Sequence, residues 1–318
     1  MTASFERVNY AVRPGKSIER KMLCGAFFRL SEFASVESYR YVGFGSAYFS
    51  DFILVHRLLG ITNMVSIERH EQNAKRVLFN RPFACIDVKF GESNDELPAL
   101  DWGVRSIVWL DYDGTLDPSV LADVRFICMS LVPGSAFAVT VNAQPPAPAV
   151  APNDALAQVT KRLGDKMPEN ISPADLSGWG TAGVYRRAID NEIAEVLADR
   201  NAARPPQQKF IYKQLFNFNY RDGQRMLTVG GVIYESGQQG LFDKCSFFGP
   251  QGLLFVRGEA DPYLIDVPML TYRELRHQDA QLPCSDLDGI DRAGVPREDV
   301  ERYSRHYRYF PMFVEAEL

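Results

Sequence analysis

The sequence has little of what marks several common classes of protein. Its 318 residues include only 5 cysteines, with no C-x-x-C pair, and 4 histidines that do not cluster. A disulfide framework is therefore not expected, and we predict no metal site. No apolar run approaches the ~20 residues that span a bilayer. Residues 1–7 lack the apolar core of a signal peptide, so we expect a cytoplasmic protein with reduced, mostly buried thiols.

A strong charge of either sign is also missing. The chain carries 35 Lys and Arg against 40 Asp and Glu, which gives a net charge of −5. This balance gives no global attraction to nucleic acid or to an anionic membrane, so a small molecule is the expected partner. Hydrophobic residues make up 46% and charged residues 24%, as in ordinary globular proteins. The length indicates one large domain with additions, or two domains, and a homodimer stays open.

What the first half does contain is a regular alternation of apolar segments and helix patterns. Apolar segments typical of strands lie at residues 39–44, 63–67, 84–90, 106–110 and 136–141. Helix patterns lie at residues 17–30, 48–59, 70–80 and 118–132. Ser17 and Asp117 are the expected N-caps, and Gly60 is an expected C-cap. This alternation predicts an α/β fold whose mostly parallel sheet is covered on both faces.

The second half has a different character. A run rich in Pro and Ala at residues 144–152 predicts a loop or lid. Further helices are expected at residues 154–167, 183–200 and 296–308, and a capping box at 271–274 opens another. Strand patterns at residues 209–220 and 224–235 flank the turn signal Arg221-Asp222-Gly223, which predicts an antiparallel hairpin. Residues 252–256 are expected to add a strand, and the aromatic segment 310–313 to dock on the core.

Candidate ligand-binding residues follow the strands, because an open parallel sheet binds ligands beyond the carboxyl ends of its strands. The first strand runs into Gly43-Phe44-Gly45-Ser46, whose glycines let the backbone approach a ligand. Glu68 ends the second strand 23 residues after Gly45, where a carboxylate can accept hydrogen bonds from both hydroxyls of a ribose. The glycine turn alone fits a plain strand-to-helix connection equally well, and the acid favours a nucleoside site.

Two further strand ends carry polar side chains. Glu92 and Ser93 follow the third strand and could meet an adenine amino group, although a plain surface loop would also contain such residues. Asp111, Tyr112 and Asp113 follow the fourth strand, where a carboxylate is placed at the edge of the sheet that faces a ligand. The alternative for these acids is a helix-entry loop, a role that Asp117 fits better than Asp111.

Together with the hairpin, these features resemble class I S-adenosylmethionine-dependent methyltransferases over residues 39–235. In that superfamily the last two strands form an antiparallel hairpin at one edge of the sheet, whereas NAD-binding Rossmann domains end with a parallel strand. The resemblance implies a Rossmann-like sheet of seven strands. It divides the chain into an N-terminal helical cap (1–38), a core (39–257) with a helical insertion at about 145–208, and a C-terminal extension (258–318).

The resemblance also implies S-adenosylmethionine as the cofactor, with the glycine turn beside its methionine part, Glu68 on the ribose and the loop after the third strand near adenine. The implied cofactor-binding residues are Gly43, Phe44, Gly45, Ser46, Glu68, Glu92, Ser93 and Asp111. Two positions depart from the family pattern: Tyr41 replaces an acid two residues before the first glycine, and Ala47 replaces a third glycine.

The expected catalytic residues are Asp111 and Asp113, either of which could deprotonate or orient a hydroxyl of the acceptor. An oxygen nucleophile is therefore the default acceptor. Tyr112 is expected to border the substrate. Lys16 and Arg20, on the N-terminal helix, could contact an anionic substrate, although a solvated helix face would also carry them.

Two alternatives remain open. Residues 111–116 also match the D-x-D-G-T-L signature of haloacid dehalogenase-like phosphatases, in which Asp111 would be the nucleophile, Asp113 a general acid/base and Mg²⁺ the counter-ion of the phosphate. Such phosphatases usually start with this strand, whereas three strands are expected before it here. The other alternative is a non-catalytic protein that binds a nucleotide or S-adenosylmethionine.

Overall fold

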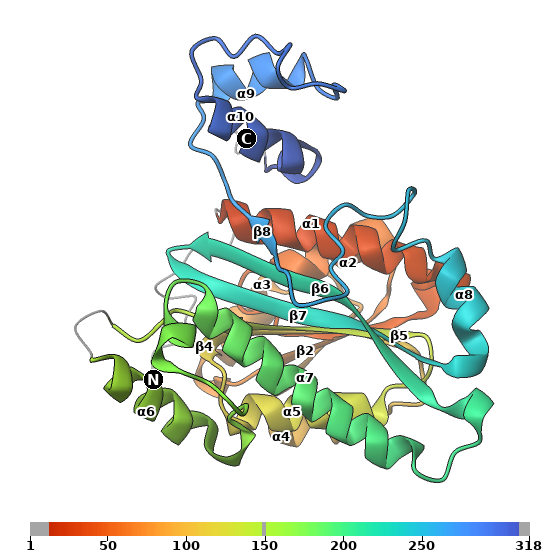
Figure 1. The fold of residues 1–318 in the computed structure, drawn as a ribbon. Coiled ribbons are helices and arrows are strands. Elements are labelled where there is room, and N and C mark those ends of the chain that lie inside the picture. Colours follow the sequence, from red (N-terminus) through yellow and green to blue (C-terminus); the bar gives the residue numbers. More distant parts are fainter. Residues whose placement is uncertain (1–12, 148–150, 312–318) are drawn as a thin grey trace.

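The computed structural model describes residues 13–147 and 151–311, which build one sheet between two layers of helices (Figure 1). The strands are β1 (Arg40–Gly43), β2 (Asn63–Glu68), β3 (Ile86–Phe90), β4 (Ser106–Thr115), β5 (Ser135–Asn142), β6 (Phe210–Asp222), β7 (Gln224–Glu235) and β8 (Tyr263–Ile265). Their order is β3-β2-β1-β4-β5-β7-β6-β8. Within the described ranges only β7 runs against its neighbours. The α/β class and the hairpin are confirmed, with eight strands where seven were expected.

The connection order of the sheet reverses beside β1. The chain passes from β1 outward to β2 and β3 and then returns to place β4 on the other side of β1. Gly43 is in register with Ser66 of β2 and with Trp109 of β4. Gly45, Glu68 and Asp111, each two positions further along the chain, therefore meet at the same edge of the sheet. Open α/β sheets bind ligands at this edge.

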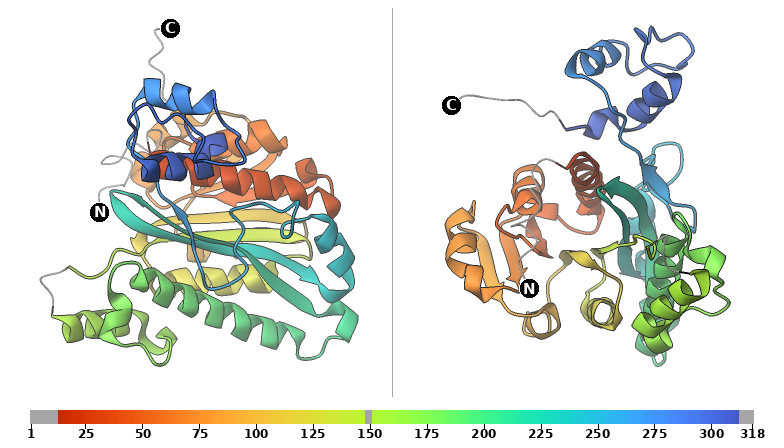
Figure 2. Two further views of the ribbon diagram at one scale, coloured as in Figure 1. Left: turned by 45° about the horizontal axis from the view of Figure 1, so that its top comes forward. Right: turned by 90° about the vertical axis from the view of Figure 1, so that its left-hand side faces the viewer.

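Helices cover both faces of this sheet because both faces of its central strands are apolar. The helices are α1 (Pro14–Phe28), α2 (Ser50–Leu59), α3 (Ala74–Asn80), α4 (Ser93–Glu96), α5 (Pro118–Ser130), α6 (Pro152–Leu163), α7 (Gly180–Asn201), α8 (Gln239–Lys244), α9 (Tyr272–Asp279) and α10 (Arg297–His306). α1, α2 and α3 pack on one face and share one apolar core. α5 and α7 pack on the other face over a second core (Figures 1 and 2).

α1 begins three residues before the expected start, and its N-terminus is capped from a distant part of the chain. Pro14 stands at the first helical position, where its missing N–H costs nothing, so Ser17 lies inside the helix. The carboxylate of Asp222, at the tip of the β6–β7 hairpin, accepts hydrogen bonds from the backbone N–H of Gly15 (3.1 Å) and Lys16 (2.8 Å). This tertiary cap satisfies donors that a local cap would otherwise bind.

The expected strand at residues 252–256 is wrong. This stretch forms turns, and Phe255 and Val256 are buried without pairing as a strand. The additional strand is β8, which pairs in parallel with β6. An apolar run of five residues predicts burial but does not distinguish a strand from a turn that packs on the core.

Several local predictions are confirmed. The Asp117 side chain caps α5 by accepting from the Val120 N–H at 3.0 Å, and Gly60 ends α2 with a φ of 69°. Thr271 forms the expected capping box with Glu274 at the start of α9. The prediction of a lid at residues 144–152 falls in part on 148–150, which lie outside the described residues.

The last part of the chain forms a lobe that follows β8 and stands apart from the sheet (Figures 1 and 2). It contains α9 and α10 and has a small apolar cluster of its own around Ile290, Val295 and Val300. Phe310 returns to the core side, where its carbonyl accepts a hydrogen bond from Lys21 of α1 at 3.0 Å. Docking of the aromatic tail is thus confirmed for Phe310, whereas residues 312 and 313 lie outside the described ranges. The three-part domain division stays a prediction.

All five cysteines are free. Cys24, Cys128 and Cys245 are buried, and Cys85 is partly buried, as expected for reduced thiols. Cys284 is the one cysteine whose side chain is exposed. None of the helices in the described ranges combines the length and the apolar character that crossing a bilayer would require.

Candidate active site

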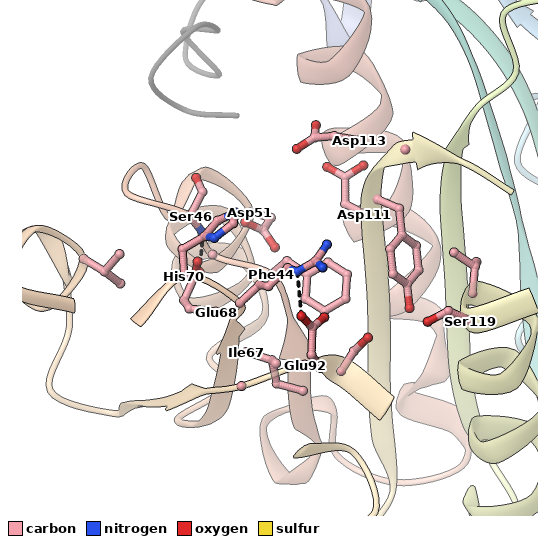
Figure 3. Close-up of a pocket in the computed structure, with 18 of the residues that line it drawn as sticks. Phe44, Ser46, Asp51, Ile67, Glu68, His70, Glu92, Asp111, Asp113 and Ser119 are labelled. Atoms are coloured by element: carbon pink, nitrogen blue, oxygen red, sulfur yellow. Dashed lines mark hydrogen bonds and ion pairs between the residues drawn. The ribbon is translucent and has the colours of Figure 1, made fainter. Parts of the chain in front are cut away.

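A cavity of about 380 Å³ lies at the carboxyl ends of β1, β2, β3 and β4. Its lining includes predicted residues from all four strand ends, namely Phe44, Gly45, Ser46, Glu68, Glu92, Ser93, Asp111, Tyr112 and Asp113. Figure 3 shows Asp111 and Asp113 at one end, Glu92 at the other, and Phe44 between them. The residues proposed from separate turns of the sequence therefore meet around one space, with the exception of Gly43 and Lys16.

The glycines of the first turn are required by packing within the protein. A Cβ on Gly45 would lie 2.5 Å from a ring carbon of Phe49 and 2.7 Å from Oγ of Ser66. A Cβ on Gly43 would lie 3.1 Å from the carbonyl oxygen of Trp109. The turn is thus tight because Phe49, Ser66 and Trp109 pack against it, and close approach to a ligand is not needed to explain it. Ser46 follows with a φ of 51°, in the left-handed region.

Glu68 joins this turn to the end of β2. Its Oε1 atom accepts hydrogen bonds from the backbone N–H of Ser46 at 2.6 Å and from Oγ of Ser66 at 3.2 Å. Burial raises the pKa of Glu68 to about 7, although both hydrogen bonds act in the opposite direction. Because both bonds reach Oε1, Oε2 is the oxygen that remains to accept hydrogen bonds from a ligand.

The loop after β3 is held by a carboxylate that the sequence did not indicate. Asp123 of α5 accepts hydrogen bonds from the side chains of Ser93, Asn94 and Tyr112. Tyr112 was expected to border the substrate, but its hydroxyl points to this loop and so to the side predicted for adenine. Glu92 forms an ion pair with Arg69 at 2.7 Å, and both side chains are more than half exposed. The expected loop is in part the short helix α4.

Asp111 and Asp113 do not follow β4 but belong to it. The strand continues to Thr115, and its pairing with β5 shifts register between Asp111 and Thr115. This irregularity leaves Asp111 partly exposed and Asp113 exposed, both at the lining of the cavity. The two acids therefore share one end of the cavity, as Figure 3 shows.

The predicted roles of Lys16 and Arg20 have different outcomes. The side chain of Lys16 is only 1% exposed, and its ammonium forms an ion pair with Asp111 at 2.6 Å. Lys16 does not line the cavity, so its predicted contact with an anionic substrate is wrong. Its ammonium is paired with a carboxylate of the protein instead. Arg20, about one turn further along α1, does line the cavity.

Asp51, which the sequence analysis missed, also lines the cavity. It stands in the first turn of α2, and its Oδ2 accepts a hydrogen bond from the Tyr41 hydroxyl at 2.6 Å. Burial raises the pKa of Asp51, and the charge of Arg20 lowers it. Tyr41 occupies the position at which the family usually carries an acid, so Asp51 supplies a carboxylate next to that position. His70 lines the cavity as well.

The phosphatase alternative gains nothing from this geometry. Oδ1 of Asp111, the expected nucleophile, is held in an ion pair with Lys16. Asp111 also stands on the fourth strand of the chain, which lies inside the sheet, whereas such phosphatases usually start with this strand. Across residues 13–147 and 151–311, no three His, Cys, Asp or Glu side chains group as metal ligands. The order of the parallel strands instead brings Glu68 and Asp111 to opposite sides of Gly45.

Among solved structures, this chain is similar to the O-methyltransferase TomG from Streptomyces achromogenes in complex with SAM, at 18% identity and a TM-score of 0.36 over 67% of this chain and 79% of that one. It is also similar to a LepI variant in complex with SAH and a substrate analogue, at 9% identity and a TM-score of 0.35 over 61% of this chain and 43% of that one. The SAM-dependent methyltransferase SibL, in its apo form, matches at 12% identity and a TM-score of 0.36 over 67% and 54%.

The matched part spans about half of the LepI and SibL chains. At such identities and scores the likeness says nothing about ligands or activity. No curated protein matches the sequence. Residues 8–318 match the model of the family described as "Putative O-methyltransferase", and because this match covers nearly the whole sequence, the chain belongs to that family.

Proposed function

We propose that this protein is an S-adenosylmethionine-dependent methyltransferase that transfers a methyl group to an oxygen atom of a small-molecule acceptor. Family membership supports the reaction type. The cavity supports the cofactor, because its volume of about 380 Å³ lies in the range of small-molecule sites and its lining combines apolar with polar and charged side chains.

The observation that carries the proposal is the meeting of Glu68 with the glycine turn at the cavity. A carboxylate whose pKa is raised to about 7 by burial gains from any ligand that donates hydrogen bonds to it. The two hydroxyls of a ribose are such donors. Ser46, whose N–H binds the same carboxylate at 2.6 Å, fixes the orientation of the carboxyl group before a ligand arrives.

The two ends of the cavity match the two ends of S-adenosylmethionine. Arg20 and Asp51 offer one cation and one anion, which suit the carboxylate and the ammonium of the methionine part. At the other end, Tyr112 and Ser93 are held by Asp123 in a fixed arrangement beside Glu92, which suits a planar base with polar edges. A site for an extended anion would need several cations, whereas acids outnumber arginines in the lining of this cavity.

The cofactor supplies an electrophilic methyl group when it is bound. Asp111 or Asp113, which share one end of the cavity, takes the proton that the acceptor hydroxyl loses as its oxygen bonds to the methyl carbon (Figure 3). Phe44 and Ile67 line the same cavity with apolar surface and exclude water from it. The main task of the protein is to align the acceptor oxygen with the methyl carbon.

Calorimetric binding of S-adenosylhomocysteine and transfer of labelled methyl from S-adenosylmethionine to a panel of phenols, alcohols and carboxylic acids test the proposal. The Glu68→Ala variant should lose binding of S-adenosylhomocysteine. The Asp87→Asn variant, which changes an exposed acid of β3 that does not line the cavity, should bind like the wild type. Unchanged binding in Glu68→Ala would remove this residue from the site.

The same measurements separate the alternatives. A ligand present at about 100 times its dissociation constant should stabilise the fold by about 2.7 kcal/mol, which a thermal-shift assay detects readily. Stabilisation by S-adenosylhomocysteine without methylation of any acceptor would indicate a binding protein without turnover. Stabilisation only by Mg²⁺ together with a phosphate mimic would indicate the phosphatase.

A further inference from the structure

A buried cluster of charges connects α1 with the acceptor end of the cavity. The ammonium of Lys16 donates to Oδ1 of Asp111 at 2.6 Å and to the Tyr220 hydroxyl at 3.2 Å, and it forms an ion pair with Glu19 at 2.7 Å. These three acceptors match the three N–H donors of a lysine. The ammonium also lies 4.4 Å from the ring centroid of Trp109, a cation–π contact.

Side chains of three strands hold this cluster on the sheet. Glu19 accepts a hydrogen bond from Oγ1 of Thr228, which in turn contacts Oγ1 of Thr140 at 2.7 Å. The indole N–H of Trp109 donates to the same Thr140 oxygen at 2.9 Å. Strands β4, β5 and β7 therefore hold the lysine and its partners in one arrangement, and removal of any member would leave a buried polar group without its partner.

Only one carboxylate of this cluster reaches the cavity. The Asp111 side chain is 24% exposed, whereas those of Lys16 and Glu19 are 1% and 0% exposed. One ammonium faces two carboxylates, so with both of them ionised the cluster carries an excess negative charge that one added proton would cancel. Burial raises the pKa of Glu19, while the adjacent Lys16 lowers it. Within this cluster, Asp111 is the member that lines the cavity and can take up a proton from it.

We propose that Lys16 is a positioning residue for methyl transfer, which acts through Asp111. This inference rests on the function proposed above. The ammonium holds Oδ1 and so leaves Oδ2 as the oxygen that takes the proton of the acceptor hydroxyl. A proton received there makes the cluster neutral, and it leaves to solvent through the exposed side of Asp111. The N-terminal helix is thereby part of the catalytic arrangement and not only a cover.

The Lys16→Met variant removes the ammonium and keeps the length of the side chain. We expect kcat to fall at least ~10-fold, because general base catalysis contributes about 10²–10⁴-fold. The KM for S-adenosylmethionine and the affinity for S-adenosylhomocysteine should change less than ~2-fold, because Lys16 does not line the cavity. Lys21→Met is the matched control: this lysine lies on the same helix, and its ammonium binds the carbonyl oxygen of Phe310.

A double-mutant cycle with Asp111→Asn tests the route. If Lys16 acts through Asp111, Lys16→Met should cause no further loss of kcat in the Asp111→Asn background. An equal loss in both backgrounds, or an unchanged kcat in the single variant, overturns the proposal. Lys16→Met leaves Glu19 without its cation and could unfold the protein for that reason. In that case the double variant Lys16→Met/Glu19→Gln, which removes both charges, takes the place of Lys16→Met in the cycle.

A spectroscopic measurement separates this inference from the proposed function. The ¹³C resonance of the Asp111 carboxyl group, assigned by its absence in Asp111→Asn, should move in Lys16→Met and stay in place in Lys21→Met. This readout needs no turnover, so it still tests the Lys16–Asp111 pair if the wild type methylates nothing. A resonance that does not respond to Lys16→Met overturns the inference whatever the activity of the protein.

Discussion

Binding of the cofactor should depend on pH through Glu68. Burial raises the pKa of this carboxyl group from its ordinary value of 4.5 to about 7. The ionised form accepts hydrogen bonds from a ribose, whereas the protonated form, with its neutral carboxyl, is a weaker acceptor. The pKa is raised, so the free protein holds the proton below pH 7. Affinity should therefore be full above that pH and should be lost as the pH falls through it.

The size of the effect follows from this value. If only the ionised form binds, roughly one molecule in eleven is competent at pH 6, and about ten in eleven are competent at pH 8. The dissociation constant for S-adenosylhomocysteine should therefore be about tenfold higher at pH 6 than at pH 8, a difference of about 1.4 kcal/mol. Each binding event should release about 0.9 proton at pH 6, about half a proton at pH 7 and about 0.1 at pH 8.

Isothermal titration calorimetry in buffers with different ionisation enthalpies measures both quantities. Glu68→Gln should bind weakly at every pH and release no proton. Glu92→Gln, which changes an exposed acid at the same cavity, should keep the pH dependence of the wild type. An equal dissociation constant at pH 6 and pH 8, or binding at pH 6 without proton release, would refute the assignment of Glu68 to the ribose.

Three further outcomes are expected. Gly45→Ala should lower the free energy of unfolding by about 1–3 kcal/mol in denaturant titrations, because its Cβ would meet Phe49, whereas Gly25→Ala, with nothing within 4 Å, should not. Asp123→Ala should weaken S-adenosylhomocysteine binding by about fivefold or more in calorimetry, since three side chains lose a hydrogen bond worth ~1 kcal/mol each. Asp51→Asn should weaken binding of S-adenosylhomocysteine but leave binding of adenosine unchanged, and a parallel loss for both ligands would contradict its role at the methionine end.

The part of the site that could be predicted from the sequence is the part built from strand ends. Gly45, Glu68 and Asp111 each follow an apolar strand, and parallel pairing brings such positions to one edge whatever the details of packing. The hairpin could be predicted for the same reason, because its turn signal and its two strands adjoin in the chain. Local helix caps such as Asp117 could be predicted equally well.

The missed residues depend on how helices are rotated and on contacts between distant segments. The spacing of Phe52, Val55 and Leu59 predicts the buried face of α2, but it does not reveal that Asp51 faces a cavity. Asp123 stands in an apolar helix face, and its partners come from other elements. Lys16 appeared to be a solvated or substrate-binding lysine, because its partner Asp111 lies 95 positions away in the sequence.

The cap that Asp222 places on α1 has a consequence for the order of folding. The two hydrogen bonds of this cap join residues that lie 207 and 206 positions apart in the sequence. During synthesis the first helix therefore leaves the ribosome long before the aspartate that caps its N-terminus. Contacts of such long range form late, because the intervening loop must be closed first. A nascent chain that stops before the hairpin tip can build the first parallel strands, but the N-terminus of the helix that carries Lys16 and Arg20 still lacks its cap.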